Sequence, residues 1–157
     1  MGSRSKGKVI IAVGLPGSGK STYFARRGIH PLCSDMLRLW LLDDEADQRY
    51  QPWIFGALRY LLSVRLELRF PESYVDATNL TRSERKQYLR LGARYGCDVE
   101  AIFFDVPLAV CLKRNQRRSR PVPPDAIEGM ARKLRPPALD EGFSKIKVVR
   151  PGLRKRN

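Results

Sequence analysis

The chain has 157 residues, enough for about one domain, and carries 30 Lys and Arg residues against 16 Asp and Glu residues, a net charge of +14. Its 43% hydrophobic content is typical of a globular protein and argues against intrinsic disorder. No apolar run reaches the roughly 18 residues of a membrane span. Three scattered cysteines and one histidine argue against a disulfide framework and a zinc site. We therefore expect a cytoplasmic protein, and the basic excess suggests a polyanionic partner.

The predicted elements alternate between strands and helices. Short apolar runs predict strands at residues 8–14, 30–33, 73–76, 99–104 and 146–149. Helices are expected at residues 21–26, 35–41, 52–70, 81–95, 107–118 and 125–134. Ser34 is expected to cap the second helix, and Thr81 with Glu84 to form a capping box for the fourth. This order predicts an α/β fold with a mainly parallel central sheet of about five strands and helices on both faces.

The strongest functional signal is the segment from Gly14 to Ser21, GLPGSGKS, which matches the phosphate-loop pattern G-x-x-x-x-G-K-[ST] at every fixed position. A predicted strand precedes it and a predicted helix follows, so backbone N–H groups and the helix N-terminus would face a triphosphate. Lys20 would reach the β- and γ-phosphates, the Ser21 hydroxyl would bind Mg²⁺, and Thr22 could reach an inner phosphate. The expected ATP-binding residues of this loop are Gly14, Leu15, Pro16, Gly17, Ser18, Gly19, Lys20, Ser21 and Thr22. The chain is thus predicted to bind a nucleoside triphosphate, as a phosphotransferase or a hydrolase.

Asp35 and Arg38 stand three residues apart at the start of the second predicted helix, so they share one face of it. The carboxyl end of the strand before that helix should face the same crevice as the phosphate loop. Asp35 would suit a general base that accepts a hydroxyl proton, and Arg38 would suit a phosphate on the acceptor. The alternative is an Asp favoured by the helix dipole, with Arg38 as its surface partner.

Arg114 and Arg118 lie four residues apart near the end of the helix at 107–118, before a proline-rich break at 121–124. This arrangement suits a mobile lid whose arginines close over the triphosphate and stabilise the transferring charge. The alternative is a solvated basic helix end that interacts with its own dipole.

The helix at 81–95 carries a basic residue at every fourth position, Arg82, Lys86, Arg90 and Arg94. This stripe is either a solvated face or a track for a nucleic acid backbone.

Other polar and aromatic residues are assigned by their local sequence. Asp76 ends an apolar strand, where it could hold a Mg²⁺-bound water or cap local backbone. The acidic segment at 43–47 is expected to be a solvated loop, and His30 to pack or to face water. Trp40 and Trp53 are expected in the core rather than as platforms for a base.

In this order the segments resemble the P-loop kinase module of bacterial end-healing 5′-OH polynucleotide kinases. The matching segments are residues 14–22, Ser34-Asp35-x-x-Arg38, residues 75–80 with Arg82, Arg114-Asn115-x-x-Arg118, and residues 141–143. The resemblance implies a three-layer P-loop kinase fold over residues 8–149, with a helical lid at about 112–135. A basic N-terminal segment at 1–7 and a basic tail at 150–157 flank this domain.

The resemblance also implies residue roles. Asp35 would be the general base and Arg38 the contact to the acceptor phosphate, with Asn79 and Arg82 also on the acceptor side. The residues implied to stabilise the transferring phosphoryl group are Lys20, Arg114 and Arg118. Which of Arg117, Arg118 and Arg120 fills the second lid position stays open, because arginines crowd this segment.

The activity implied by the resemblance is transfer of the γ-phosphate of ATP, or another NTP, with Mg²⁺ to 5′-OH ends of DNA or RNA in end-healing and repair. Members of this family are often fused to a phosphatase or a ligase. The chain lacks the motifs D-x-D-x-T and K-x-D-G of those enzymes, so a ligase or phosphatase would be a partner or a further domain. One alternative is a kinase for a metabolite or antibiotic hydroxyl. Another is a non-catalytic module that senses nucleotide or binds nucleic acid.

Overall fold

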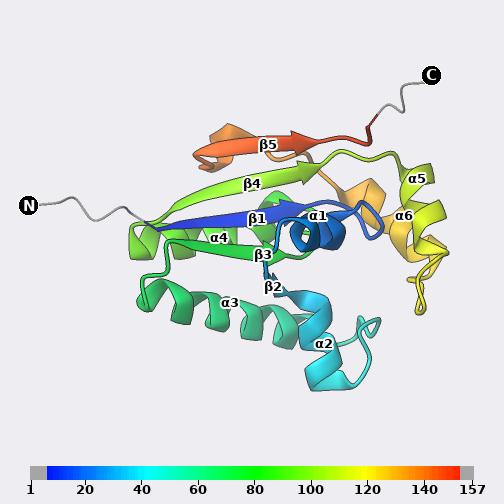
Figure 1. Cartoon of the computed structure of the whole chain (residues 1–157), viewed down its shortest axis with the longest axis horizontal. Coiled ribbons are helices and arrows are strands. Elements are labelled where there is room, and N and C mark those ends of the chain that lie inside the picture. The colour runs from blue at the N-terminus through cyan, green and yellow to red at the C-terminus, as the bar shows by residue number, and fades with distance from the viewer. Residues whose placement is uncertain (1–6, 153–157) are drawn as a thin grey trace, which may run out of the picture.

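The apolar run near the start of the chain forms the central strand of a five-stranded sheet. The computed structural model describes residues 7–152, so most of the expected basic terminal segments, 1–6 and 153–157, lies outside the described residues. The strands are β1 (Lys8–Val13), β2 (Leu32–Cys33), β3 (Glu72–Asp76), β4 (Asp98–Phe104) and β5 (Lys145–Val149). Their order is β2-β3-β1-β4-β5 and all neighbours are parallel, so the carboxyl ends share one edge of the sheet (Figure 1). The predicted parallel sheet is confirmed.

Helices connect the strands and cover both faces of the sheet (Figure 1). They are α1 (Lys20–Arg26), α2 (Ser34–Leu42), α3 (Gln51–Glu67), α4 (Arg82–Tyr95), α5 (Leu108–Asn115), α6 (Pro124–Lys133) and the short 3₁₀ helix η1 (Leu139–Glu141). Side chains alternate along a strand, so Val9, Ile11 and Val13 of β1 share a core with α3 and α4, whereas Ile10 and Ala12 share one with α1. The three-layer α/β fold is therefore confirmed. Among the described residues, no helix combines the length and the apolar character that crossing a membrane requires.

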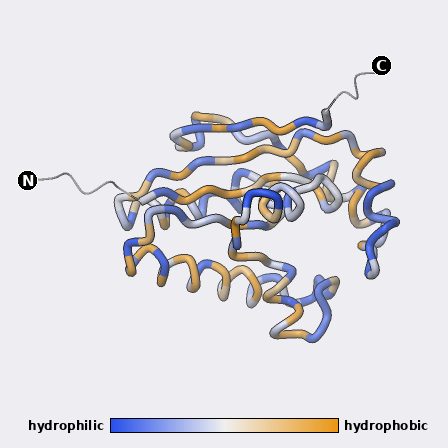
Figure 2. The backbone as a smooth tube through the Cα atoms, viewed as in Figure 1, coloured by the Kyte–Doolittle hydropathy of each residue, from blue (hydrophilic) through white to orange (hydrophobic). Residues whose placement is uncertain are grey.

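The helix α3 packs on the sheet through a stripe of buried residues four positions apart, namely Ile54, Leu58, Leu62 and Leu66. Figure 2 shows the hydrophobic colour along the strands and α3, and the hydrophilic colour in the turn after α5. Trp53 lies one residue before the stripe and is 77% exposed, and Trp40 of α2 is 66% exposed. The prediction that both tryptophans belong to the core is wrong, because their helical positions point away from the sheet.

Several predicted helix ends differ from the observed ones, and α3 ends at Glu67 rather than at residue 70. Cys33, in extended conformation, is the N-cap of α2, and Ser34 is already the first helical residue, with no capping hydrogen bond. The helix α5 ends at Asn115 rather than at Arg118, because the buried Asn115 amide binds the backbone of Val122. Its Nδ2 donates to the Val122 carbonyl at 2.7 Å, and its Oδ1 accepts from the Val122 N–H at 3.0 Å. This pairing closes the loop that carries Arg118.

A fully buried arginine joins α4 to two distant segments. The Nε and Nη2 atoms of Arg85 donate to the two carboxylate oxygens of Glu141, at 2.9 and 3.0 Å. Its Nη1 donates to the carbonyls of Asn79, Leu80 and Arg135 at 2.9 to 3.1 Å. Arg85 is 0% exposed, so five hydrogen bonds replace the water that its guanidinium loses on folding. The segment after β3 and the segment after α6 are thereby fixed to the same helix.

We expect Glu141→Ala to lower the free energy of unfolding by about 3–5 kcal/mol, because it leaves the Arg85 charge buried without a counter-charge. Asp140→Ala is the matched control, since Asp140 pairs at 3.3 Å with the exposed Arg82 and the loss of such a surface pair costs at most about 1 kcal/mol. Urea unfolding followed by circular dichroism measures both. Equal losses in the two variants would contradict a structural role for Arg85.

Candidate active site at the carboxyl edge of the sheet

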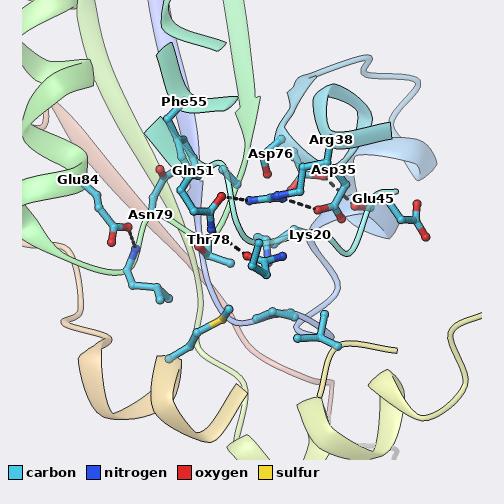
Figure 3. Close-up of a pocket in the computed structure, with 18 of the residues that line it drawn as sticks. Lys20, Asp35, Arg38, Glu45, Gln51, Phe55, Asp76, Thr78, Asn79 and Glu84 are labelled. Carbon is cyan, nitrogen blue, oxygen red and sulfur yellow. Dashed lines mark hydrogen bonds and ion pairs between the residues drawn. The ribbon is translucent and has the colours of Figure 1, made fainter. Parts of the chain in front are cut away.

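A cavity of about 680 Å³ opens where β1, β2 and β3 end (Figure 3). Its walls come from the phosphate loop, α2, the α2–α3 loop, α3, the segment after β3, α4, and the α5–α6 segment. The predicted site residues that line it are Pro16, Gly17, Gly19, Lys20, Ser21, Thr22, Asp35, Arg38, Asn79, Arg114 and Arg118. The fold therefore brings most of the predicted ATP-side and acceptor-side residues to one cavity.

At two positions the backbone of the phosphate loop adopts a conformation that strongly favours glycine. Gly17 and Gly19 have φ of 81° and 95°, in the left-handed region. A Cβ at Gly17 would lie 2.5 Å from the carbonyl oxygen of Cys111, so a side chain there would collide with α5. Leu15 packs beneath the loop against Leu80 and Cys111 rather than lining the cavity.

Lys20 lies against the loop that it follows. Its Nζ donates to the carbonyls of Gly14 at 3.0 Å and Leu15 at 2.8 Å. Burial lowers the pKa of Lys20, and the nearby carboxylates of Asp76 and Asp35 oppose that shift. Phosphate oxygens of a bound nucleotide would be stronger acceptors for this ammonium than the two carbonyls are.

Ser21 and Asp76 meet at the end of β3. The Ser21 hydroxyl donates to Asp76 Oδ2 at 2.8 Å, and burial raises the pKa of Asp76 despite the opposing charge of Lys20. Hydroxyl and carboxylate oxygens fit Mg²⁺, which takes its other ligands from water and substrate phosphates. Within residues 7–152 no cluster of three or more His, Cys, Asp or Glu residues could hold a metal ion. An ion at Ser21 and Asp76 would therefore depend on the nucleotide for much of its coordination.

The first two turns of α2 carry a charged cluster across the cavity from the phosphate loop. Arg38 is only 5% exposed; its Nη1 donates to Asp35 Oδ1 at 2.9 Å, and its Nη2 donates to Gln51 Oε1 at 2.8 Å (Figure 3). The amide of Gln51 donates in turn to Gln48 at 2.8 Å. The α2–α3 loop and α3 thus hold the guanidinium, which orients the Asp35 carboxylate. The second oxygen of Asp35 accepts from Arg118 at 3.3 Å.

The arginines after α5 take different positions. Arg114 lies beside the loop, since its Nη1 is 3.4 Å from where a Cβ on Gly19 would stand. Arg118 reaches Asp35, and Arg120 pairs with Asp44 of the α2–α3 loop at 3.3 Å. Arg117 is absent from the lining of this cavity. The α5–α6 segment therefore bridges the phosphate side and the α2 side.

Two residues predicted on the acceptor side have other contacts. Asn79 is buried with φ of 47°, and its Nδ2 donates to the Ala12 carbonyl at 2.8 Å, so it supports the end of β1. Arg82 is outside the cavity lining and pairs with Asp140 on the surface. The basic stripe of α4 that begins at Arg82 is exposed to solvent.

Several residues that support the cavity are not evident from the sequence pattern. Gln51 and Phe55 line it from α3, and their spacing of four residues was the available signal. Arg85 was missed because its partner Glu141 is 56 residues away. It nevertheless shares the buried stripe of α4 with Tyr88 and Gly92, a position unusual for an arginine.

The AAA_33 family model, described as an AAA domain, matches residues 9–137, so the chain belongs to this family. The L-seryl-tRNA(Sec) kinase of Methanococcus maripaludis is 28% identical over 142 residues, which are 82% of this chain and 53% of that protein. A chain in the structure of the Pnkp1/Rnl/Hen1 RNA repair complex is 26% identical with a TM-score of 0.68, over 84% of this chain and 45% of that one. A gluconokinase from Sinorhizobium meliloti 1021 is 19% identical with a TM-score of 0.59, over 94% of this chain and 84% of that one. The chain thus has the P-loop kinase fold and spans about half the length of the first two relatives.

We expect Asp76→Asn to raise the free energy of unfolding at pH 7 while it weakens Mg²⁺-dependent nucleotide binding. Burial raises the pKa of Asp76 in the folded chain, so the ionised carboxylate destabilises the fold. This destabilisation grows as the pH rises from the ordinary pKa of Asp to the raised pKa of Asp76 in the folded chain. The difference in unfolding free energy between the variant and the wild type should therefore shrink toward acid pH.

Urea unfolding at pH 7 and pH 4 tests this expectation. The exposed Asp98→Asn serves as control, because surface substitutions change stability by less than about 0.5 kcal/mol. An Asp76→Asn protein less stable than the wild type at pH 7 would contradict the expected sign.

Proposed function

We propose that this member of the AAA_33 family transfers the γ-phosphate of ATP to the 5′-hydroxyl end of DNA or RNA. The observation that carries the proposal is the pairing of Asp35 with Arg38 across one cavity from the phosphate loop. A carboxylate oriented by a buried guanidinium suits the deprotonation of a hydroxyl that carries a phosphate nearby.

The polar groups around the phosphate loop and the start of α2 then have roles. Asp35 aligns the attacking 5′-hydroxyl and accepts its proton, and Arg38 binds the adjacent backbone phosphate. Lys20 stabilises the charge on the β- and γ-phosphates. Mg²⁺, held through Ser21 and Asp76, would supply neutralisation of phosphate charge. Positioning and electrostatic stabilisation provide the rate enhancement in such a site.

In this proposal the α5–α6 segment is a lid. Arg114 already lies at the phosphate loop. When ATP is bound, Arg118 would leave Asp35 and contact the transferring phosphoryl group instead. The exchange would free Asp35 to accept a proton. The loss of the partly exposed Arg118–Asp35 and Arg120–Asp44 pairs would cost little, because solvent screens such contacts.

The names of two relatives support a nucleic acid acceptor. One is named L-seryl-tRNA(Sec) kinase, and the other is a chain in the structure of an RNA repair complex. A second candidate acceptor is therefore the hydroxyl of a seryl group on tRNA, favoured by the 28% identity to L-seryl-tRNA(Sec) kinase. As a repair enzyme of the cytoplasm, the chain would work beside a ligase or phosphatase, as a partner or as a further domain.

Labelled ATP with Mg²⁺ and a panel of acceptors tests the proposal. The panel contains 5′-OH oligonucleotides of DNA and RNA, their 5′-phosphorylated forms, seryl-tRNA, and small metabolite and antibiotic hydroxyl compounds. Label on the 5′-OH oligonucleotides alone is the expected result. Label confined to seryl-tRNA or to small compounds would overturn it.

We expect Asp35→Asn to lower kcat for oligonucleotide phosphorylation by about 10²–10⁴-fold, because the amide cannot accept the hydroxyl proton. ATP affinity, measured by equilibrium titration, should change little. Asp43→Asn is the matched control at the other end of α2, since Asp43 is exposed and outside the cavity lining. Near-normal transfer by Asp35→Asn would exclude Asp35 as the base.

Arg38→Lys keeps the charge and loses the planar fork that reaches Asp35 and Gln51. We expect kcat/KM for the oligonucleotide to fall by about tenfold or more, with KM for ATP nearly unchanged. Steady-state kinetics with each substrate varied in turn measures the two effects. An equal loss of kcat/KM for the oligonucleotide and for ATP would refute an acceptor role for Arg38.

A further inference from the structure

Beside the residues of α2, the cavity is lined by side chains of α3 and α4, and we call this part of the cavity the arm. Phe55 and Arg59 line the arm from α3, and Gln87 and Tyr88 line it from α4. Phe55 and Arg59 are four residues apart, so both point to the same side of their helix. The mechanism proposed above uses none of these four side chains.

The hydroxyl of Tyr88 is buried without a partner in the wall of this arm. Tyr88 is 2% exposed, and its Oη makes no hydrogen bond to any residue in 7–152. Burial raises the pKa of Tyr88, so the group stays a neutral O–H donor at pH 7, although the nearby Arg59 opposes the shift. A buried donor without an acceptor costs stability, so a fold that keeps one points to a ligand that supplies the acceptor.

Arg59 is also without a partner among the described residues. It is half-buried, yet its guanidinium makes no hydrogen bond or ion pair within residues 7–152. Arg65 on the same helix differs, since its Nε donates to Ser73 Oγ at 3.0 Å and its Nη2 donates to the Glu72 carbonyl at 2.7 Å. The charge of Arg59 is therefore free to meet an anion in the arm.

Phe55 lies between the two cationic groups. Its ring centroid is 5.9 Å from the guanidinium carbon of Arg38, and Arg59 follows one turn along α3. From Gln51, which holds Arg38, to Arg59 the helix advances about 12 Å at 1.5 Å per residue. Gln51 and Arg59 thus stand about two turns apart on α3, and a ligand that contacts both Arg38 and Arg59 would lie along this helix beside Phe55.

We propose that this arm is a second acceptor subsite, in which Arg59 and the Tyr88 hydroxyl bind the next backbone phosphate of the strand while a base stacks on Phe55. Cation, hydroxyl donor and aromatic ring are the groups that bind single-stranded nucleic acid without reading its sequence. The inference rests on the proposed function, and it adds that the enzyme senses the acceptor beyond its terminal nucleotide.

Acceptor length separates this inference from the proposed function. The acceptors are a nucleoside 3′-phosphate, which offers one phosphate, and 5′-OH di- and trinucleotide 3′-phosphates. The KM of the wild type should be about tenfold lower for the dinucleotide 3′-phosphate than for the nucleoside 3′-phosphate, which is the effect of one charge-assisted contact. Transfer without any dependence on length would overturn the subsite and leave the proposed function standing. No transfer to any acceptor would overturn both.

Arg59→Gln should raise KM for the dinucleotide about tenfold and leave KM for the nucleoside 3′-phosphate unchanged. Arg90→Gln makes the same charge change on the exposed stripe of α4, outside the cavity. An equal rise in Arg90→Gln would assign the effect to net charge or to a track along α4, and would overturn the subsite.

Tyr88→Phe removes only the unpartnered hydroxyl, so the variant should be at least as stable as the wild type. We expect a rise of about three- to tenfold in KM for the dinucleotide alone, with kcat unchanged. The exposed Tyr60→Phe on α3 is the matched control. Urea unfolding confirms that the variants are folded, and an unchanged KM in Tyr88→Phe and Arg59→Gln would reject the subsite.

Discussion

The buried pairing of Arg85 with Glu141 fixes the geometry on which the rest of the site depends. Removing both charges from water is costly, and five hydrogen bonds to one guanidinium offset that cost. Arg85 holds the carbonyls of residues 79 and 80, and this segment in turn holds β1. The Asn79 amide binds the Ala12 carbonyl, and the Thr78 carbonyl accepts from the Gly14 N–H at 3.0 Å. The start of the phosphate loop is therefore anchored through α4.

The cavity consequently has one rigid wall and one wall made of weaker contacts. The phosphate side rests on the sheet and on the Arg85 network. The α5–α6 segment reaches the α2 side through Arg118 with Asp35 and Arg120 with Asp44, both partly exposed pairs at 3.3 Å. The two hydrogen bonds between Asn115 and Val122 fix the conformation of the loop between α5 and α6. The α5–α6 segment is thus packed on the phosphate side, where Cys111 contacts Leu15 and Leu80, and the proposed lid would open only its two exposed pairs on the α2 side.

The sequence predicted the features that depend on neighbouring residues. The apolar run of β1, the glycine pattern of the phosphate loop and the capping of α4 are local, and Thr81 does accept from the Glu84 N–H at 3.2 Å. It could not predict contacts made across the fold. Arg85 finds Glu141 only after α4 and η1 have packed, and the exposure of Trp53 depends on which side of α3 the sheet covers.

The electrostatics of the cavity explain why its charges need such support. Burial lowers the pKa of Lys20 and raises that of Asp76, so both charged forms are unfavourable in the folded chain. The two groups moderate each other, but neither has a full counter-ion contact. A nucleotide would change this balance, because its phosphates would pair with Lys20 and its metal ion would pair with Asp76. Relief of the unfavourable burial of these two charges would then contribute to the free energy of nucleotide binding. This requires that the Arg85 network holds the loop in place in the absence of nucleotide.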